Sequence, residues 1–196
     1  ETIAALNLKL AGSTEDLIIL STDKPNPVQI ESIVKETHLS EPEIEKSLEK
    51  MVKSKAIARI AFNQNFYYQT FAQWEEKVET IENELSEYHK KFPGKVGLSR
   101  NELNKNLKFS PRLADIVLNN VEKSGIIILE NGYLRLSNHK PKLSKSEENE
   151  AQLFLSMLKE KQYSPLTNSV PVSHITENLI SSGKIIKINE QIFYDT

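Results

Sequence analysis

A helix, turn and hairpin pattern that occurs three times is the strongest constraint on how this 196-residue chain folds. Each copy has the end of an amphipathic helix, a sharp stop, and two short apolar runs separated by a turn. The copies lie at residues 48–68, 118–136 and 176–194. A repeated unit implies a repeat architecture, so it is considered before any other pattern in the sequence. The repeats predict tandem modules and a protein that works by reach and contact, not by chemistry in one deep pocket.

The first module is predicted to cover residues 1–70 and to contain three helices and a hairpin. Pro25 and Pro27 separate its first two helices, because proline cannot continue a helix and restrains the residue before it. Ser40 and Glu43 have the spacing of a capping box, which marks the start of the third helix. Apolar residues then recur on one helical face, so this helix is expected to pack inward.

The second module is predicted to cover residues 71–138 and to open with a long helix over about 71–91. Ser99 and Glu102 form a second capping box, which starts a short helix. The Asn-Gly pair at 131–132 lies between apolar runs, which is a strong signal for a two-stranded hairpin.

The third module, residues 144–196, is predicted to be abbreviated. Ser144 and Glu147 cap its first helix, but only residues 164–170 occupy the position where the other modules have a second helix. Three helices followed by a hairpin is the winged-helix arrangement. We therefore expect a mainly α protein with small β-hairpins (α+β), built of tandem winged-helix modules in an elongated arrangement.

Composition and motifs argue against an enzyme. The chain has no cysteine, which excludes disulfides, thiolate catalysis and cysteine-bound zinc. It has no glycine-rich phosphate loop, and its four histidines lack partners at metal-binding spacing. No apolar run reaches the ~20 residues of a membrane span, and no signal peptide opens the sequence. We expect no catalytic, cofactor-binding or metal-binding residue, no membrane partner, and a cytoplasmic location.

Charge is distributed unevenly, although the net charge is only −2. Residues 75–87 hold six glutamates and one lysine, whereas residues 88–112 hold seven cationic side chains and Glu102. One interpretation is a solvated acidic helix followed by a solvated basic loop. The other is a phosphate-contacting patch, because phosphate contacts dominate affinity for nucleic acids. The candidate RNA-contact residues are Lys90, Lys91, Lys95, Arg100, Lys105, Lys108 and Arg112.

Two segments carry a family resemblance. In residues 88–103 a helix ends in a Tyr-His pair, passes a proline and a glycine, and restarts as a short helix. Residues 138–144, Asn-His-Lys-Pro-Lys-Leu-Ser, follow the second hairpin. The first segment resembles the C-terminal half of bacterial selenocysteine-specific translation elongation factors. The second is similar to the histidine-containing junction between the second and third winged helices of that family.

The resemblance implies a fragment of a factor whose GTPase core delivers selenocysteinyl-tRNA and whose last winged helix grips an mRNA hairpin beside the recoded UGA codon. The fragment lacks GTPase motifs, so GTP and Mg²⁺ would belong to the parent protein and no cofactor is expected here. The implied role is a spacer between core and hairpin-binding module. The implied partners are RNA (the mRNA hairpin or ribosomal RNA), the ribosome and, through the missing core, selenocysteinyl-tRNA.

Two other functions stay open from the sequence. A winged-helix DNA-binding transcriptional regulator would need arginine or asparagine on an exposed third helix, aimed at base edges. In the first module this helix alternates lysine and glutamate, which is typical of i,i+4 pairing on a solvated face. A winged-helix protein–protein scaffold is the other alternative, because a fold does not determine a function.

Overall fold

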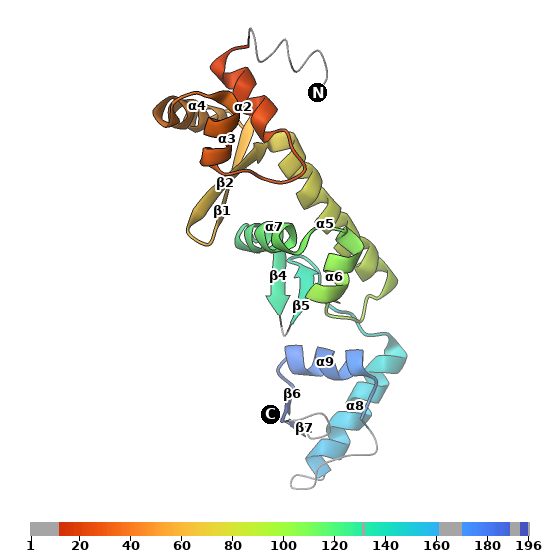
Figure 1. Ribbon diagram of the computed structural model, residues 1–196. Helices are drawn as coiled ribbons and strands as arrows, with labels where there is room; N and C mark the ends of the chain where they lie inside the picture. Colours follow the sequence, from red (N-terminus) through yellow and green to blue (C-terminus); the bar gives the residue numbers. More distant parts are fainter. Residues whose placement is uncertain (1–11, 131, 161–169, 189–192, 196) are drawn as a thin grey trace. The chain divides into compact units, whose positions relative to one another are not determined.

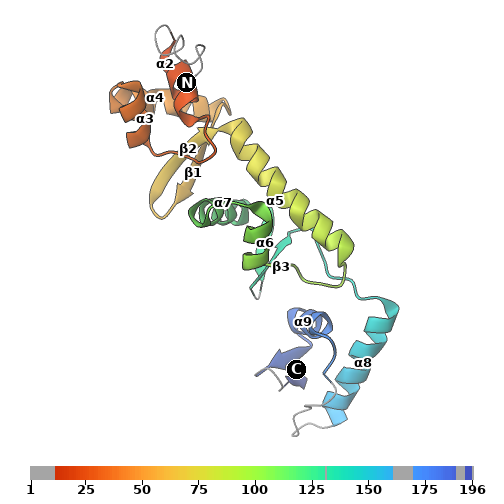
Figure 2. The ribbon, with the colours of Figure 1, turned by 45° about the vertical axis from the view of Figure 1, so that its right-hand side comes forward.

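The computed structural model describes residues 12–130, 132–160, 170–188 and 193–195 (Figures 1 and 2). It divides into two compact units. Unit 1 comprises Glu1–Ile81 and Leu107–Ser124, and unit 2 comprises Glu82–Asn106 and Gly125–Thr196. Both contain short helices and small antiparallel sheets, which confirms the predicted α+β class. None of the described helices has both the length and the apolarity that crossing a bilayer requires.

From Thr14 to Thr70, unit 1 contains three helices and a hairpin, in the order that the sequence predicts. These elements are α2 (Thr14–Thr22), α3 (Ile30–Thr37), α4 (Glu41–Lys53), β1 (Ile57–Phe62) and β2 (Asn65–Thr70). The predicted capping box is present at the start of α4, where Ser40 Oγ donates to a Glu43 carboxylate oxygen at 2.6 Å. The core between helices and hairpin is aliphatic: Ile18, Ile33, Ile44 and Ile57 are at most 1% exposed.

The segment before α3 adds a short backbone pairing to the first hairpin. Val28 N–H donates to the Tyr68 carbonyl at 2.9 Å, and Tyr68 N–H donates to the Val28 carbonyl at 2.7 Å. The Gln69 side-chain amide donates to the Lys24 carbonyl in the same loop. These bonds hold the loop of residues 24–29 against β2, and the loop forms one wall of a pocket in unit 1.

Helix α7 (Pro111–Lys123) also packs against the first hairpin within unit 1. Ile116 joins an apolar cluster with Ala58, Ile60 and Tyr67. The Asn120 side-chain amide donates to the Ala61 carbonyl at 3.0 Å. Helix α5 (Phe71–Lys91), whose bounds match the predicted long helix, runs from unit 1 into unit 2.

The predicted boundaries of the three modules, at residues 1–70, 71–138 and 144–196, stay a prediction.

Unit 2 contains a three-stranded antiparallel sheet in the order β3-β5-β4. Its strands are β3 (Leu98–Ser99), β4 (Ile127–Glu130) and β5 (Tyr133–Leu136), and α6 (Arg100–Leu107) directly follows β3. Leu98 lies opposite Leu134, which brings Gly97 against β5. A Cβ at Gly97 would stand 2.2 Å from the Leu134 carbonyl oxygen, so only glycine fits this close backbone approach.

In the described residues after 144, unit 2 also contains α8 (Lys145–Glu160), α9 (Ser173–Ser181), β6 (Ile185–Lys187) and β7 (Phe193–Asp195). Their core contains Ile175 and Leu179 of α9, with the rings of Phe154 and Phe193 edge to face at 5.9 Å. The predicted missing-helix position at 164–170 falls almost entirely on residues 161–169, which lie outside the described part of the chain.

Candidate nucleic-acid interface

The seven cationic candidates belong to both units. Unit 2 holds Lys90, Lys91, Lys95, Arg100 and Lys105, and unit 1 holds Lys108 and Arg112. All of them are exposed except Lys95, which is half-buried. The basic segment therefore supplies two separate groups of cations, one in each unit.

The end of α5 presents lysines beside aromatic rings. Lys90 Nζ pairs with Glu87 at 2.7 Å, with both side chains at least 70% exposed. An exposed pair of this kind contributes only about 0–1 kcal/mol, so Lys90 can exchange its partner for a phosphate. Lys95 Nζ lies 4.7 Å from the Phe92 ring centroid and 6.0 Å from that of Tyr88. These contacts hold Lys95 by cation–π attraction.

A shallow groove of about 530 Å³ runs beside these lysines. We call it the Tyr88 groove; its lining residues are Glu84, Glu87, Tyr88, Lys90, Lys91, Phe92 and Asn106. Glu84 accepts a hydrogen bond from the Asn106 amide, which ties α5 to α6 within unit 2. Because two carboxylates share the groove with two lysines, its net attraction for an anion is small.

The single carboxylate of the basic segment serves as a helix cap. Glu102 accepts from Ser99 Oγ at 2.6 Å and from Ser99 N–H at 3.2 Å, and Glu102 N–H donates back to Ser99 Oγ. These bonds from the Ser99 hydroxyl and amide lower the pKa of the Glu102 carboxyl, and Lys95 and Lys105 lower it further. The predicted capping box is therefore present and begins the helix that carries Arg100 and Lys105.

The two histidines of the resemblance segments meet in unit 2. The rings of His89, from α5, and His139 stack at 3.6 Å between centroids with planes 4° apart. Leu136 N–H donates to His89 Nε2 at 3.3 Å, and His139 Nε2 lies 3.0 Å from the Lys95 carbonyl oxygen. His89 is only 7% exposed. Burial, then the neighbouring His139 and Arg135, lower the pKa of His89 to about 4, so this ring is neutral at pH 7.

Further bonds hold the connector of residues 137–143 against the loop after α5. Lys142 N–H donates to the Pro93 carbonyl at 2.8 Å, and Arg135 Nη1 donates to the His139 carbonyl at 3.1 Å. On the α9 side, Tyr133 OH donates to Glu177 at 2.9 Å. We call the His89–His139 stack with these bonds the histidine junction. It fixes the position of the connector on the sheet of unit 2.

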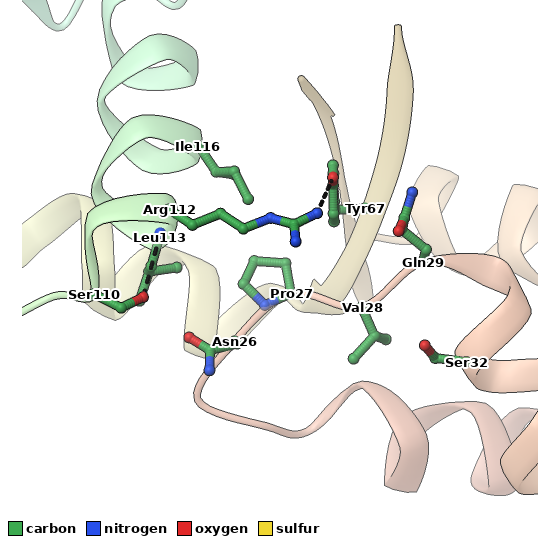
Figure 3. Close-up of a pocket in the computed structure, with 10 residues that line it drawn as sticks. All are labelled: Asn26, Pro27, Val28, Gln29, Ser32, Tyr67, Ser110, Arg112, Leu113 and Ile116. Carbon is green, nitrogen blue, oxygen red and sulfur yellow. Dashed lines mark hydrogen bonds between the residues drawn. The ribbon is translucent and has the colours of Figure 1, made fainter. Parts of the chain in front are cut away.

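A smaller pocket in unit 1, of about 320 Å³, contains Arg112 (Figure 3). Arg112 Nη2 donates to Tyr67 OH at 3.0 Å, and the guanidinium carbon lies 5.9 Å from the Tyr67 ring centroid. Ser110 caps α7 at the pocket edge, where its Oγ accepts from Leu113 N–H. We call this the Arg112 pocket. Among the described residues, no three His, Asp or Glu side chains gather to hold a metal ion.

Comparison with known proteins gives one family. Residues 83–136 match the family described as elongation factor SelB, winged helix. This segment is similar to a SelB winged helix. Its span includes all seven cationic candidates and His89, and it ends three residues before His139. The family resemblance that the sequence suggested is thereby confirmed.

Among the solved structures similar to the chain is the mRNA-binding domain of elongation factor SelB from E. coli in complex with SECIS RNA. It is 15% identical, has a TM-score of 0.46, and aligns over 58% of this chain and 86% of that one. No curated protein sequence matches the chain significantly.

The histidine junction was not predictable from the residues alone. His89 and His139 are fifty positions apart, so no local pattern connects them. The resemblance segments were the available signal, because each contains one of the two histidines. The role of Tyr67 in holding Arg112 was missed for the same reason, since β2 and α7 are brought together only by folding.

Proposed function

We propose that this chain is an RNA-contacting winged-helix arm of a SelB-type translation elongation factor, acting through position and phosphate contact without catalysis. The observation that carries the proposal is that the SelB winged-helix match contains every member of the basic segment. Exposed lysine and arginine side chains bind phosphate without reading sequence. With a net charge of −2, the chain would bind RNA locally and weakly.

We further propose that the arm is a spacer, which links a GTPase and tRNA-delivery core to an mRNA-hairpin-binding module during UGA recoding. GTP and Mg²⁺ would be bound by that core, and the ribosome would be a partner in the cytoplasm. The histidine junction supports a spacer role. A spacer can hold two binding modules at a set distance only if the segments that connect its own parts keep a fixed conformation. The stack of His89 on His139 and the Lys142–Pro93 bond fix such a connector in unit 2.

A DNA-reading role has less support from the geometry. The third helix of the SelB segment is α7, and its Asn120 amide is bonded to the Ala61 and Ile116 carbonyls. An asparagine that reads adenine needs this amide free for the base edge. Leu113, Ile116 and four other residues of α7 are buried, which leaves few side chains to enter a groove.

The test measures fluorescence anisotropy of a labelled stem–loop RNA, a single-stranded RNA and a random DNA duplex with the full chain. One variant removes three exposed cations of unit 2: Lys90→Gln, Lys91→Gln and Lys105→Gln. A matched control removes three exposed lysines of α3 and α4: Lys35→Gln, Lys46→Gln and Lys50→Gln.

The proposal predicts RNA affinity that falls on the order of tenfold or more in the first variant and less than about threefold in the control. Equal losses in both variants would show that only net charge matters. Stronger binding to duplex DNA than to RNA would favour the regulator, and absence of any nucleic-acid binding would favour the protein scaffold.

A further inference from the structure

The Arg112 pocket differs in charge from two other hollows of the chain. Its ten lining residues include one cation, Arg112, and no carboxylate. The Tyr88 groove contains two glutamates, and so does the hollow between α4 and the first hairpin, where Glu45 and Glu49 face Lys53 and Arg59. An anion entering either of those two meets negative charge, whereas an anion entering the Arg112 pocket meets one positive charge and no carboxylate in its lining.

The guanidinium of Arg112 is held in place before any ligand arrives. Figure 3 shows the side chain reaching from α7 across Pro27 toward Tyr67. Tyr67 is 6% exposed and belongs to the hairpin cluster with Ile116, so its hydroxyl is a fixed acceptor. A guanidinium has five N–H donors, and the Tyr67 bond at 3.0 Å uses one of them. The remaining donors suit the two-oxygen contact that arginine makes with phosphate.

The other walls offer neutral polar groups and an apolar surface. Asn26, Gln29 and Ser32 contribute amides and a hydroxyl from the loop and first turn of α3. Gln29 is the N-cap residue of α3, but its side chain makes no capping bond. The loop is fixed by the backbone pairing of Val28 with Tyr68. Pro27 and Ile116 give the pocket an apolar side.

We infer that the Arg112 pocket binds one phosphorylated nucleoside unit. The phosphate contacts the Arg112 guanidinium, the base lies against Pro27 and Ile116, and the amides of Asn26 and Gln29 serve the ribose hydroxyls or the base edge. A volume of about 320 Å³ is near the lower end for small-ligand sites, about 300–1,000 Å³, which fits one nucleotide and not a duplex. The inference rests on the proposed function in one respect: the expected source of the unit is a nucleotide of the RNA strand.

The test uses the full chain with ¹⁵N labelling and three probes: an eight-residue oligouridylate, uridine monophosphate and inorganic phosphate. Anisotropy gives the RNA affinity, and amide shifts locate each probe. Arg112→Gln removes the phosphate contact. Arg112→Lys keeps the positive charge but loses the paired N–H donors of the guanidinium. Tyr67→Phe removes only the hydroxyl that holds the guanidinium. Lys123→Gln is the matched control, because it removes one exposed charge from the other end of α7.

Arg112→Gln should weaken oligouridylate binding on the order of tenfold, because a hydrogen-bonded charge contact is lost. Arg112→Lys and Tyr67→Phe should fall between this variant and wild type, and Lys123→Gln should change affinity less than about twofold. Amide shifts should centre on residues 26–32 and 110–116. Shifts with oligouridylate alone assign the source to an RNA strand, and equal shifts with uridine monophosphate assign it to a free nucleotide.

The two proposals fail in different ways. If RNA binds but Arg112→Gln behaves like Lys123→Gln, with no shifts around the pocket, the pocket inference is wrong and the RNA-contacting role stands. If RNA does not bind but uridine monophosphate shifts the pocket amides, the pocket stands and the RNA role is wrong. If no probe binds, both are wrong.

Discussion

Lowering the pH from 7 to 4 should destabilise unit 2 through His89. Burial, the His139 ring and the Arg135 guanidinium all oppose a positive charge on this imidazole and lower its pKa from 6.5 to about 4. Leu136 N–H also donates to His89 Nε2 at 3.3 Å. A proton on Nε2 would therefore bring two N–H donors face to face and break this hydrogen bond. The Nδ1 atom has no partner among the described residues that could compensate.

The sign and size follow from the two pKa values. Between pH 6.5 and about 4 the unfolded chain binds a proton at His89 that the folded chain excludes, so stability falls as the pH falls. A difference of about 2.5 pH units corresponds to about 3 kcal/mol at 1.36 kcal/mol per unit. This loss is large beside the ~5–15 kcal/mol that stabilises a typical domain.

The assay combines an NMR titration with urea unfolding. The ring protons of His89 should titrate near pH 4, and the free energy of unfolding should fall by about 3 kcal/mol between pH 7 and 4 from this group alone. His89→Gln keeps an acceptor for Leu136 N–H and should remove that part of the pH dependence. His38→Gln, at an exposed histidine of unit 1, should retain it. A His89 midpoint near 6.5, or identical pH profiles for wild type and His89→Gln, would show that burial of this ring does not couple its protonation to the stability of unit 2.

Four further substitutions test the packing and the helix capping. Gly97→Ala places a methyl group 2.2 Å from the Leu134 carbonyl, so we expect a loss of about 2–4 kcal/mol in urea unfolding; Gly132→Ala, which meets no atom within 4 Å, should cost only about 1 kcal/mol for its positive φ. Ser40→Ala removes the cap of α4 and should lower the free energy of unfolding by about 1 kcal/mol, with a change of less than 0.3 kcal/mol contradicting the capping role. Ile116→Ala should cost about 2–5 kcal/mol by emptying the cluster under α7, and a near-neutral result would mean that α7 does not pack on the first hairpin.

Local structure was predictable because its signals lie within a few residues. The capping boxes at Ser40 and Ser99 start helices where expected, and the long helix has its predicted bounds of Phe71–Lys91. Periodicity predicted an inward face for the third helix of the first module, and Ile44 and Leu48 of α4 are buried as expected. These features depend on spacing along the chain, which the sequence displays directly.

Contacts between distant segments were not predictable from the residues. Strand β3 has only two residues, and its pairing with β5 depends on a partner thirty-six positions away. The same holds for the Val28–Tyr68 bridge and the His89–His139 stack. No local period encodes such register, because it is selected by packing of the whole unit. The candidate site was therefore predictable as a list of cations, but not as one groove, one junction and one pocket.

The salt dependence of RNA affinity is the sharpest test of whether the basic segment contacts RNA phosphates. Anisotropy of a labelled single-stranded RNA is measured with the full chain at several salt concentrations, and the logarithm of affinity is plotted against that of salt. Contact with RNA phosphates should give a negative slope with a magnitude of about 0.7 for each contact. Replacing Lys90, Lys91 or Lys105 by glutamine should reduce this magnitude by about that amount for each lysine removed. An affinity that does not change with salt or with these substitutions would show that the basic segment makes no phosphate contacts.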